Sequence, residues 1–385
     1  MKVLAIETSC DDTSVALIKA RKNKRASFDI LSNIISSQIE IHKKWGGVYP
    51  TLAKREHQKN LIPVLEKALK RANEFKVLKK PKLQSKTVQK ILEREPDLLE
   101  DYQKLIPKIQ KPKIDAIATT IGPGLEPCLW VGINFARALA CSWNLPLIPV
   151  NHIEAHIYAN YLTEESEGFI FPAISLIVSG GHTQLILMEN HGKYSLLGET
   201  RDDAAGECLD KIARILGLDY PGGPIIEEKA LKFKKGGSKT QVDLPRPMIH
   251  SKDYDFSFSG LKTAVLYDYK KRSSKIRKSK NYIRQIAHES QQAIIDVLIY
   301  KTIKAAKNYR VKSIILGGGV VANNELRKQF KEQVKNEFPN LEIQMPSPNF
   351  CTDNAAMTAV TSHFHLKERK EWKNIKAKAN LKLTK

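Results

Sequence analysis

The stretch KVLAIETSCDDTSVALIKA, residues 2–20, predicts a β-hairpin, and this hairpin decides the fold class. KVLAIE and VALIKA are short apolar runs typical of buried strands, and the polar TSCDDTS between them predicts the connecting turn. Residues 173–189, AISLIVSGGHTQLILME, repeat the order of strand, polar turn and strand in the second half of the chain. Two such hairpins indicate a duplicated α/β lobe.

The segments around the hairpins alternate between strand-like and helix-like patterns. Strands are predicted at residues 114–120 and 146–150, and helices at residues 52–71 and 129–144. KSIILGGGVVANNELRKQF, residues 312–330, predicts a strand, a triple-glycine turn and a helix. Glycines at such a turn let backbone N–H groups approach a phosphate or a nucleoside, although one glycine triplet alone is weak evidence for a nucleotide site.

One segment, residues 73–112, departs from this compact pattern because it is highly charged and has few small residues. Prolines bound it, and we expect an inserted, largely helical arm. The arm is either a solvated surface insertion or a contact for RNA or a partner protein. Lys79, Lys80, Lys82 and Lys86 cluster within it.

The bulk composition fits a two-lobed intracellular enzyme. The chain has 385 residues and a formal net charge of +22, which favours a polyanionic partner such as RNA or DNA. No run reaches the ~18 apolar residues of a transmembrane helix, and the first residues do not resemble a signal peptide. We therefore expect no membrane association. The five cysteines are irregularly spaced, which predicts a reducing cytoplasm.

The stretch NHIEAHIYAN, residues 151–160, carries a possible metal site. On a helix, His152 and His156 lie only about 40° apart, on one face, which suits two ligands of one metal. Glu154 falls about 200° from His152, so it cannot act as the base of a zinc peptidase. The alternative is a partly buried helix with two hydrogen-bonded histidines, and a metal site would need a third ligand.

A set of motifs in fixed order gives the chain a close resemblance to the bacterial tRNA N(6)-adenosine threonylcarbamoyltransferase family, TsaD. The resemblance covers the chain except the insertion and the tail, and its motifs are IETSCDDTSVALI, GPGL, NHIEAH, LIVSGGHTQL, DDAAGECLDK, LGLDYPGGP, DFSFSGLKTA, GGGVVANNELR and CTDNAAM. It implies a two-lobed actin/hexokinase-like (duplicated RNase H-like) α/β fold with a nucleotide cleft. It also implies transfer of threonylcarbamoyl from its adenylate to the exocyclic amine of the adenosine following the anticodon, in tRNAs that read ANN codons.

The resemblance also implies site residues and cofactors. His152, His156 and Asp353 match the ligands of one divalent metal, commonly iron (Fe2+), although such ligands also accept zinc, manganese or magnesium. Asp11 and Asp12 match groups essential for transfer. The implied substrate-binding positions, for an adenine nucleotide or threonylcarbamoyl-adenylate, are Ile177, Val178, Ser179, Gly180, Gly181, Asp210, Gly223 and Asn323. Asp210 could instead be a helix-surface carboxylate, and Asn323 could also be a helix N-cap.

The resemblance further implies partners and a division of the chain. Members of the family act on tRNA with a smaller paralogous subunit (TsaB-like) and a small ATPase (TsaE-like). We expect lobe I at 1–150 with the insertion, lobe II at 151–352, and a C-terminal helix at 353–385 that returns to lobe I. The chain departs from the usual pattern at Asp12 (usually Glu), at Thr51 (usually Glu) and in its tail, and these changes bear on partner contacts and cleft closure.

Three other functions remain to be weighed. A metallopeptidase would use the histidine pair, but it would lack its base. An actin-like sugar kinase would suit the fold, although fold alone does not decide function and such a kinase does not need the three metal ligands. A non-catalytic RNA-binding scaffold would leave those ligands unexplained.

Overall fold

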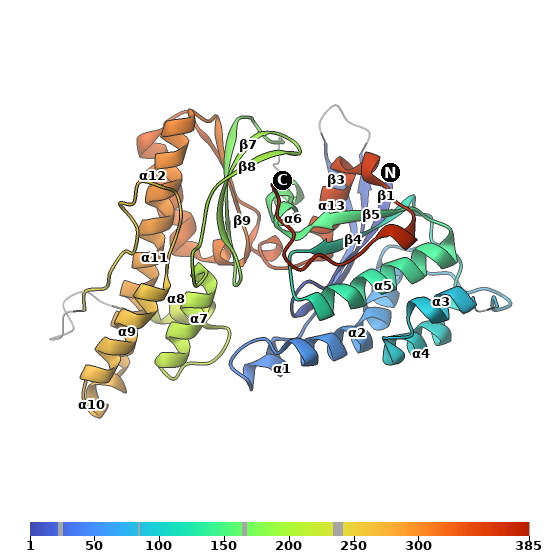
Figure 1. Ribbon diagram of the computed structural model, residues 1–385, viewed down its shortest axis with the longest axis horizontal. Coiled ribbons are helices and arrows are strands. Elements are labelled where there is room, and N and C mark those ends of the chain that lie inside the picture. The colour runs from blue at the N-terminus through green and yellow to red at the C-terminus, as the bar shows by residue number, and fades with distance from the viewer. Residues whose placement is uncertain (22–25, 84, 164–167, 234–241, 385) are drawn as a thin grey trace.

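The computed structural model describes residues 1–21, 26–83, 85–163, 168–233 and 242–384, and its strands form two five-stranded sheets (Figure 1). The first sheet contains β1 (Lys2–Glu7), β2 (Asp12–Ala20), β3 (Phe28–Ser37), β4 (Ala116–Gly122) and β5 (Leu147–Asn151). The second contains β6 (Ala173–Val178), β7 (Thr183–Asn190), β8 (Lys193–Glu199), β9 (Ser313–Gly317) and β10 (Glu342–Gln344).

The two sheets have the same topology. The first runs in the order β3-β2-β1-β4-β5, and the second, read from the opposite edge, runs β8-β7-β6-β9-β10. In each sheet the first three strands pair antiparallel, and the fourth and fifth join in parallel. This repetition confirms the predicted duplication, and the fold is the two-lobed actin/hexokinase-like fold.

The two predicted hairpins are β1–β2 and β6–β7. β2 begins at Asp12, three residues earlier than predicted, because Asp12 pairs with Ser37 of β3. The sequence analysis did not predict β3, which lies at the edge of its sheet and has mostly half-exposed side chains. Such a strand lacks the continuous apolar run that made β1 recognisable.

The helices cover the sheets in three layers. They are α1 (Ile39–Lys43), α2 (Pro50–Arg71), α3 (Lys86–Ile91), α4 (Pro96–Leu105), α5 (Glu126–Trp143), α6 (His152–Tyr158), α7 (Ala205–Ile215), α8 (Gly222–Leu231), α9 (Ser259–Lys271), α10 (Ser274–Arg277), α11 (Lys280–Tyr309), α12 (Asn324–Glu337) and α13 (Ala355–Phe364). Helices α2 and α5 pack on the outer face of the first sheet. Helices α7, α8, α9, α11 and α12 cover the outer face of the second. No helix among the described residues is both long and apolar enough to span a membrane.

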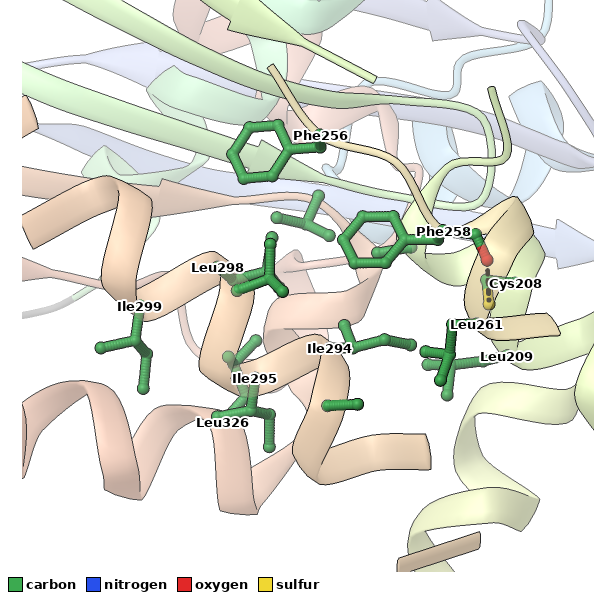
Figure 2. Close-up of a cluster of buried hydrophobic side chains, with 14 of the residues drawn as sticks. Cys208, Leu209, Phe256, Phe258, Leu261, Ile294, Ile295, Leu298, Ile299 and Leu326 are labelled. Carbon is green, nitrogen blue, oxygen red and sulfur yellow. Dashed lines mark hydrogen bonds between the residues drawn. The ribbon is translucent and has the colours of Figure 1, made fainter. Parts of the chain in front are cut away.

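Helices α6 and α13 lie between the two sheets, where they share one buried cluster with both (Figure 1). The α13 segment AAMTAVTS has mostly small side chains, which let it pack closely against β1 and β2. Larger side chains fill the outer core of the second lobe, where Phe256 and Phe258 face Ile294 and Leu298 of α11 (Figure 2). Because α6 and α13 pack closely between the sheets, this central layer holds side chains at the junction of the lobes in fixed positions.

The inserted arm is less helical than predicted. Within the described residues of 73–112, only α3, α4 and a short 3-10 turn, Ile106–Lys108, are helical. The arm also packs on the first lobe instead of standing free: Leu98 is buried, and the Tyr102 hydroxyl lies 2.8 Å from Ser142 Oγ of α5. A cavity of about 200 Å³ lies between the arm and α5. All four clustered lysines, from Lys79 to Lys86, are exposed.

The C-terminal segment contains less helix than predicted, because α13 ends at Phe364. The following residues run along the first lobe and cover the turn between β4 and α5. Lys378 N donates to Ile121 O at 2.8 Å, and Gly124 N donates to Ala379 O at 3.1 Å. Gly122 has no room for a side chain there, since an added Cβ would clash with the Lys378 carbonyl.

Candidate metal centre

Helix α6 begins at the carboxyl end of β5 and presents both histidines on one face. Asn151 caps the helix, because its Oδ1 accepts hydrogen bonds from Ile153 N at 2.8 Å and Glu154 N at 3.2 Å. His152 is therefore the first helical residue, and His156 follows one turn later. The side chains of both histidines are buried.

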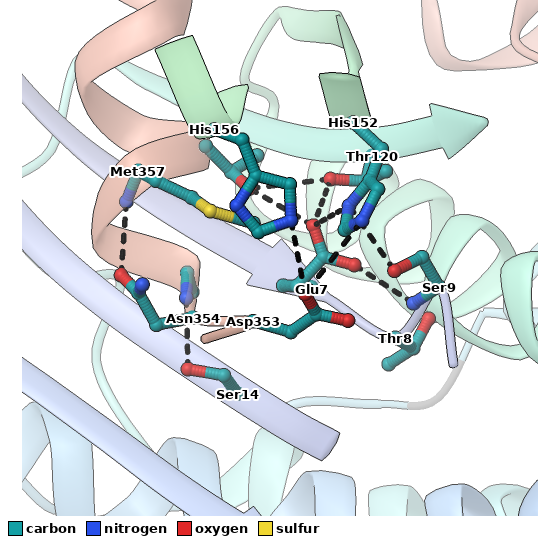
Figure 3. Close-up of polar contacts among 12 residues, drawn as sticks. Glu7, Thr8, Ser9, Ser14, Thr120, His152, His156, Asp353, Asn354 and Met357 are labelled. Atoms are coloured by element: carbon teal, nitrogen blue, oxygen red, sulfur yellow. Dashed lines mark hydrogen bonds and ion pairs between the residues drawn. The ribbon is translucent and has the colours of Figure 1, made fainter. Parts of the chain in front are cut away.

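Asp353 reaches the same place from the other central helix. Asn354 caps α13 by accepting from Met357 N at 3.1 Å, and this cap holds the preceding Asp353 at the helix start. His156 Nε2 lies 3.2 Å from Asp353 Oδ1, and His152 Nε2 lies 3.6 Å from the same oxygen (Figure 3). One ligand atom from each of the three side chains lies within 4.8 Å of the others.

These three residues fit a divalent metal. Two ligand atoms each about 2.1 Å from one ion lie roughly 3 Å apart at ordinary coordination angles, close to the distances seen. Both ring nitrogens of His156 are buried, and apart from the 3.2 Å contact between Nε2 and Asp353 Oδ1 neither has a polar partner among the residues that the structure describes. Buried imidazole nitrogens normally find partners, and a cation bound between His156 Nε2 and Asp353 would satisfy Nε2 as a metal ligand.

A second carboxylate, Glu7, contacts the Nδ1 side of the His152 ring, opposite the Nε2 atom that faces Asp353. Glu7 Oε2 lies 3.5 Å from His152 Nδ1, and Ser9 Oγ lies 3.2 Å from the same nitrogen (Figure 3). Glu7 is fully buried and accepts hydrogen bonds from Ser9 N at 2.7 Å and from the hydroxyls of Thr120 and Thr358. A carboxylate at the second nitrogen fixes the ring and strengthens the first as a ligand. This role of Glu7 was not predicted from the sequence, where Glu7 simply ends an apolar strand.

The charges of the site are strongly coupled. Burial disfavours a charged His152, but the carboxylates of Asp353 and Glu7 outweigh it and raise the pKa of His152 to about 9. Burial likewise opposes ionisation of Asp353, yet the two histidines hold its pKa well below the usual range. The site thus attracts positive charge, which either a proton or a metal ion can satisfy.

Glu154 points away from these residues, as its helical position predicts. Its Oε2 forms an ion pair with His365 Nε2 at 2.8 Å, and its Oε1 accepts from the Tyr194 hydroxyl at 2.5 Å. A peptidase base at this glutamate is therefore excluded by geometry. Glu154 instead ties α6 to the residue that follows α13, and so helps to hold the histidines in place relative to Asp353.

We predict that this ion pair makes stability depend on pH. Burial opposes the charge on His365, but Glu154 raises its pKa to about 9, above the ordinary 6.5. A histidine whose pKa is raised on folding stabilises the folded state in its protonated form. This contribution is complete below about pH 6.5 and is lost as the pH rises through about 9. Glu154→Gln should therefore cost about 2 kcal/mol of unfolding free energy at pH 6 and much less near pH 10. Urea titrations of both proteins at the two pH values measure this difference, and a pH-independent difference would contradict it.

The tip of the first hairpin carries two further carboxylates, Asp11 and Asp12, and the charge of Asp353 acts on both. Burial, followed by the charge of Asp353, raises the pKa of Asp12 to about 7, and both effects also raise the pKa of Asp11. Asp12 Oδ1 is buried and has no hydrogen-bond partner in the described part of the chain. The main-chain oxygen of Asp11 accepts from Gln38 N at 3.0 Å, so the tip is anchored to the segment that follows β3.

His57 of α2 supports this tip, and the sequence analysis did not identify it. Its Nε2–H donates to the Cys10 carbonyl at 3.0 Å, so Nδ1 is the acceptor for the Thr13 hydroxyl at 2.8 Å. Burial lowers the pKa of His57 to about 4 and keeps the ring neutral. The ring thus holds the hairpin on both sides of Asp11 and Asp12. Its only sequence signal is a histidine within the otherwise polar AKREHQKN.

The second hairpin tip lies near the three metal-ligand candidates, since the charges of all three act on its His182. Ile177 and Val178 have fully buried side chains, so a bound molecule would meet only their main chain. Ser179 is half-buried, whereas Gly180 and Gly181 are exposed and an added Cβ at either glycine would meet open space. His182, which the sequence analysis did not single out, completes this tip. Its own burial, together with the charges of His152 and His156, lowers its pKa to about 4.

The remaining predicted positions lie on the second lobe. Asp210 is not a free surface carboxylate, since its Oδ1 accepts from Gly222 N at 2.7 Å, and burial raises its pKa to about 6. Gly223 is half-buried beside open space. Asn323 is the N-cap of α12, accepting from Leu326 N at 2.9 Å, and its amide also donates to Gln291. The atypical Thr51 is exposed in the first turn of α2.

Comparisons with known proteins identify the family of the chain. The family model described as TsaD, tRNA N6-adenosine threonylcarbamoyltransferase, matches residues 29–76 and 97–360, and so leaves out part of the arm. A Syntrophomonas wolfei protein of that name is 43% identical over 95% of this chain and 93% of its own. A Thermosipho africanus protein of that name is 44% identical over 94% of each chain. Among solved structures, a ROK hexokinase from Thermus thermophilus is 13% identical over 96% of this chain and 100% of its own, with a TM-score of 0.42.

Proposed function

Because the chain belongs to the tRNA N6-adenosine threonylcarbamoyltransferase family, we propose that it transfers threonylcarbamoyl from its adenylate to the exocyclic amine of an adenosine in tRNA. The acceptor would be the adenosine following the anticodon in tRNAs that read ANN codons. The observation that carries this proposal is the convergence of His152, His156 and Asp353 beside the Asp11–Asp12 tip. A peptidase would need a base that Glu154 cannot supply.

We propose that His152, His156 and Asp353 hold one divalent metal, with Fe2+ favoured by the two-histidine, one-carboxylate set. When bound, the metal would supply Lewis-acid polarisation of a substrate oxygen. Glu7 would keep the His152 ring oriented through its Nδ1 side. The ion pair between Glu154 and His365 would hold α6 against the α13 side of the site.

The transfer joins the carbonyl carbon of threonylcarbamoyl to N6 of adenosine and breaks the bond from that carbon to a phosphate oxygen. Adenosine monophosphate leaves, and the amine loses one proton. We propose that Asp12 accepts this proton, since a carboxylate with a pKa of about 7 suits a general base near neutral pH. Asp11, on the same tip, would position the amine, while His57 keeps the tip in place.

The adenylate would lie between the two hairpin tips. Main-chain groups of Ile177, Val178, Ser179, Gly180 and Gly181 would contact its acyl phosphate, since this tip is open and lacks obstructing side chains. Asp210 could accept from a ribose hydroxyl near Gly223, and Asn323 could contact the nucleoside from the start of α12. For the chain as a whole we propose lobe I at 1–150, lobe II at 151–352 and a returning segment at 353–385.

We further propose that the protein acts in the cytoplasm with a smaller paralogous subunit and a small ATPase, while a separate enzyme makes the adenylate. The test is reconstitution with those proteins and an ANN-decoding tRNA, followed by mass spectrometry of the nucleosides. Threonylcarbamoyladenosine should form only when the complete set and the adenylate are present. Its absence under conditions that saturate every component would refute the proposed activity.

The exposed lysines of the arm give a prediction about RNA binding. If they contact tRNA, replacing Lys79, Lys80, Lys82 and Lys86 with glutamine should weaken binding and flatten its salt dependence. The slope of log affinity against log salt should fall by about one unit for each lost phosphate contact, with adenylate binding unchanged. The matched control replaces the exposed lysines Lys328, Lys331 and Lys335 on the outer helix α12. If the slope of log affinity against log salt is unaltered in the arm variant, the arm does not contact tRNA through these lysines and is a solvated surface insertion.

A further inference from the structure

Two large aromatic side chains are exposed side by side in the turn between α1 and α2. Trp45 is 66% exposed and Tyr49 is 56% exposed. Their rings stack on each other with centroids 5.9 Å apart and planes inclined by 27°. A stacked pair has little freedom, yet the outer face of each ring remains open to a further planar group.

The turn is built to hold these rings in place. Trp45 N donates to His42 O at 2.9 Å, and Gly46 follows with φ of +65°, a value that glycine adopts without strain. Tyr49 N donates to Nδ1 of the buried His42 at 3.3 Å. The segment therefore presents its aromatic side chains from a fixed backbone.

A short chain of hydrogen bonds connects this turn to the proposed reaction site. Because His42 Nδ1 accepts from Tyr49, its Nε2 carries the proton and donates to Gln38 Oε1 at 3.1 Å. Gln38 N in turn donates to the main-chain oxygen of Asp11 at 3.0 Å. The aromatic pair and the Asp11–Asp12 tip thus share one support.

The turn also meets the second lobe. Lys43 Nζ lies 3.4 Å from Asp219 Oδ2, just before the Tyr220–Pro221 segment that leads to α8. A Cβ added at Gly46 would lie 3.9 Å from Arg214 Cδ of α7. In Figure 1, α1 lies below the junction between the two sheets, beside the α7 end of the second lobe. The aromatic pair therefore stands where the two lobes meet.

The chemistry of the surroundings favours RNA over a protein partner. The exposed neighbours include Lys43, Lys44, Thr51 and Arg55, which are polar or basic. Gly46 and Pro50 in the turn and the acidic Glu40 in α1 are also exposed, so basic side chains outnumber acidic ones around the pair. An isolated aromatic pair in such a setting offers too little apolar surface for a protein interface. It does match the way in which proteins bind single-stranded loops, with aromatic rings under unstacked bases and basic side chains near phosphates.

We propose that Trp45 and Tyr49 form a stacking platform for an unstacked base of the tRNA loop that carries the reacting adenosine. This inference rests on the proposed function, because it assumes an RNA loop at the Asp11–Asp12 tip. The stacked base would be a neighbour of the reacting adenosine. Its capture would hold the loop while the exocyclic amine meets the adenylate.

The test measures the affinity of the full chain for an ANN-decoding tRNA by fluorescence anisotropy over a range of salt concentrations. Trp45→Ala should weaken binding by about tenfold to a hundredfold, the range for one lost base stack. The slope against log salt should stay unchanged, because stacking releases no counterions. Trp45→Phe keeps a ring and should stay within about threefold of the wild-type affinity. Tyr309→Ala, which removes an exposed ring at the far end of α11, is the matched control and should bind as the wild type does.

Three outcomes would overturn the platform: unchanged affinity in Trp45→Ala, a flattened salt slope, or a loss of affinity for the smaller paralogous subunit instead of RNA. Melting temperatures establish that each variant is folded, and an exposed ring should change them little. The nucleoside assay keeps the two proposals apart. Modification by the wild type with unchanged tRNA affinity in Trp45→Ala would reject the platform alone. Weakened tRNA binding in Trp45→Ala without any modification by the wild type would reject the proposed transfer alone.

Discussion

His156→Ala should strip the protein of its bound metal and lower the rate of threonylcarbamoyl transfer by about a thousandfold or more. His156 is one of three candidate ligands, and its Nε2 faces Asp353 Oδ1 at 3.2 Å. Loss of one of three protein ligands leaves too few to hold an ion in an oriented site, and the polarisation of the substrate oxygen is then lost. Elemental analysis of the purified variant measures the metal, and the nucleoside assay measures the transfer.

The fold should survive this change with a moderate loss of stability. The His156 side chain is only 1% exposed, so alanine leaves a void and should cost about 1–3 kcal/mol. His156→Gln fills more of that space and separates the loss of the ligand from the loss of packing. The matched control is Glu154→Gln on the same helix, which should retain the metal because Glu154 points to His365. Full metal occupancy in His156→Ala would refute the assignment of the site, whereas loss of metal in Glu154→Gln would show that the ion pair with His365 is needed to align the ligands.

Asp12→Asn should reduce transfer by about a hundredfold to a thousandfold and yet leave the protein as stable as before or slightly more stable. The amide has the shape of the carboxylate but cannot accept the proton that the amine loses, and general-base catalysis typically contributes about 10²–10⁴-fold. The stability should not fall, because Asp12 Oδ1 is buried without a hydrogen-bond partner among the described residues. Burial and the charges of Asp353, Asp11 and Glu7 also oppose ionisation of the carboxyl group. Thermal melts and single-turnover transfer assays give the two readouts.

Asp11→Ala extends this prediction to the rest of the tip. Since the main-chain oxygen of Asp11 accepts the hydrogen bond from Gln38 N, truncation of the Asp11 side chain leaves this anchor in place. Asp11→Ala should therefore abolish modification with little change in melting temperature. Near-normal activity in Asp12→Asn or Asp11→Ala would mean that the corresponding carboxylate has only a structural role. A large drop in melting temperature would point to the same conclusion.

The fold was predictable to the extent that its information is local. The apolar runs of β1 and β6 and the polar turns after them are contiguous, and a duplicated hairpin is visible without any tertiary contact. The half-exposed edge strand β3 was missed because its stability comes from pairing with β2, which its own residues do not reveal. The arm was predicted too helical because its two ends pair with each other as extended chain, and this pairing between distant residues is not visible in the local charge pattern. Val77 pairs with Ile109, and Leu78 N donates to Lys108 O at 2.7 Å.

Helical periodicity alone placed His152 and His156 on one face and Glu154 on the other, and the chain determined this much by itself. Tertiary structure alone decided that Asp353, some two hundred residues later, meets them, because α6 and α13 are packed together between the sheets. It also decided the roles of Glu7, His57 and His182, which depend on distances between segments far apart in the chain. The Trp45–Tyr49 contact is local, but the exposure of the two rings is decided by how the rest of the chain packs. Burial and neighbouring charges, which give Asp12 and His365 their shifted pKa values, exist only once the sheets enclose those side chains.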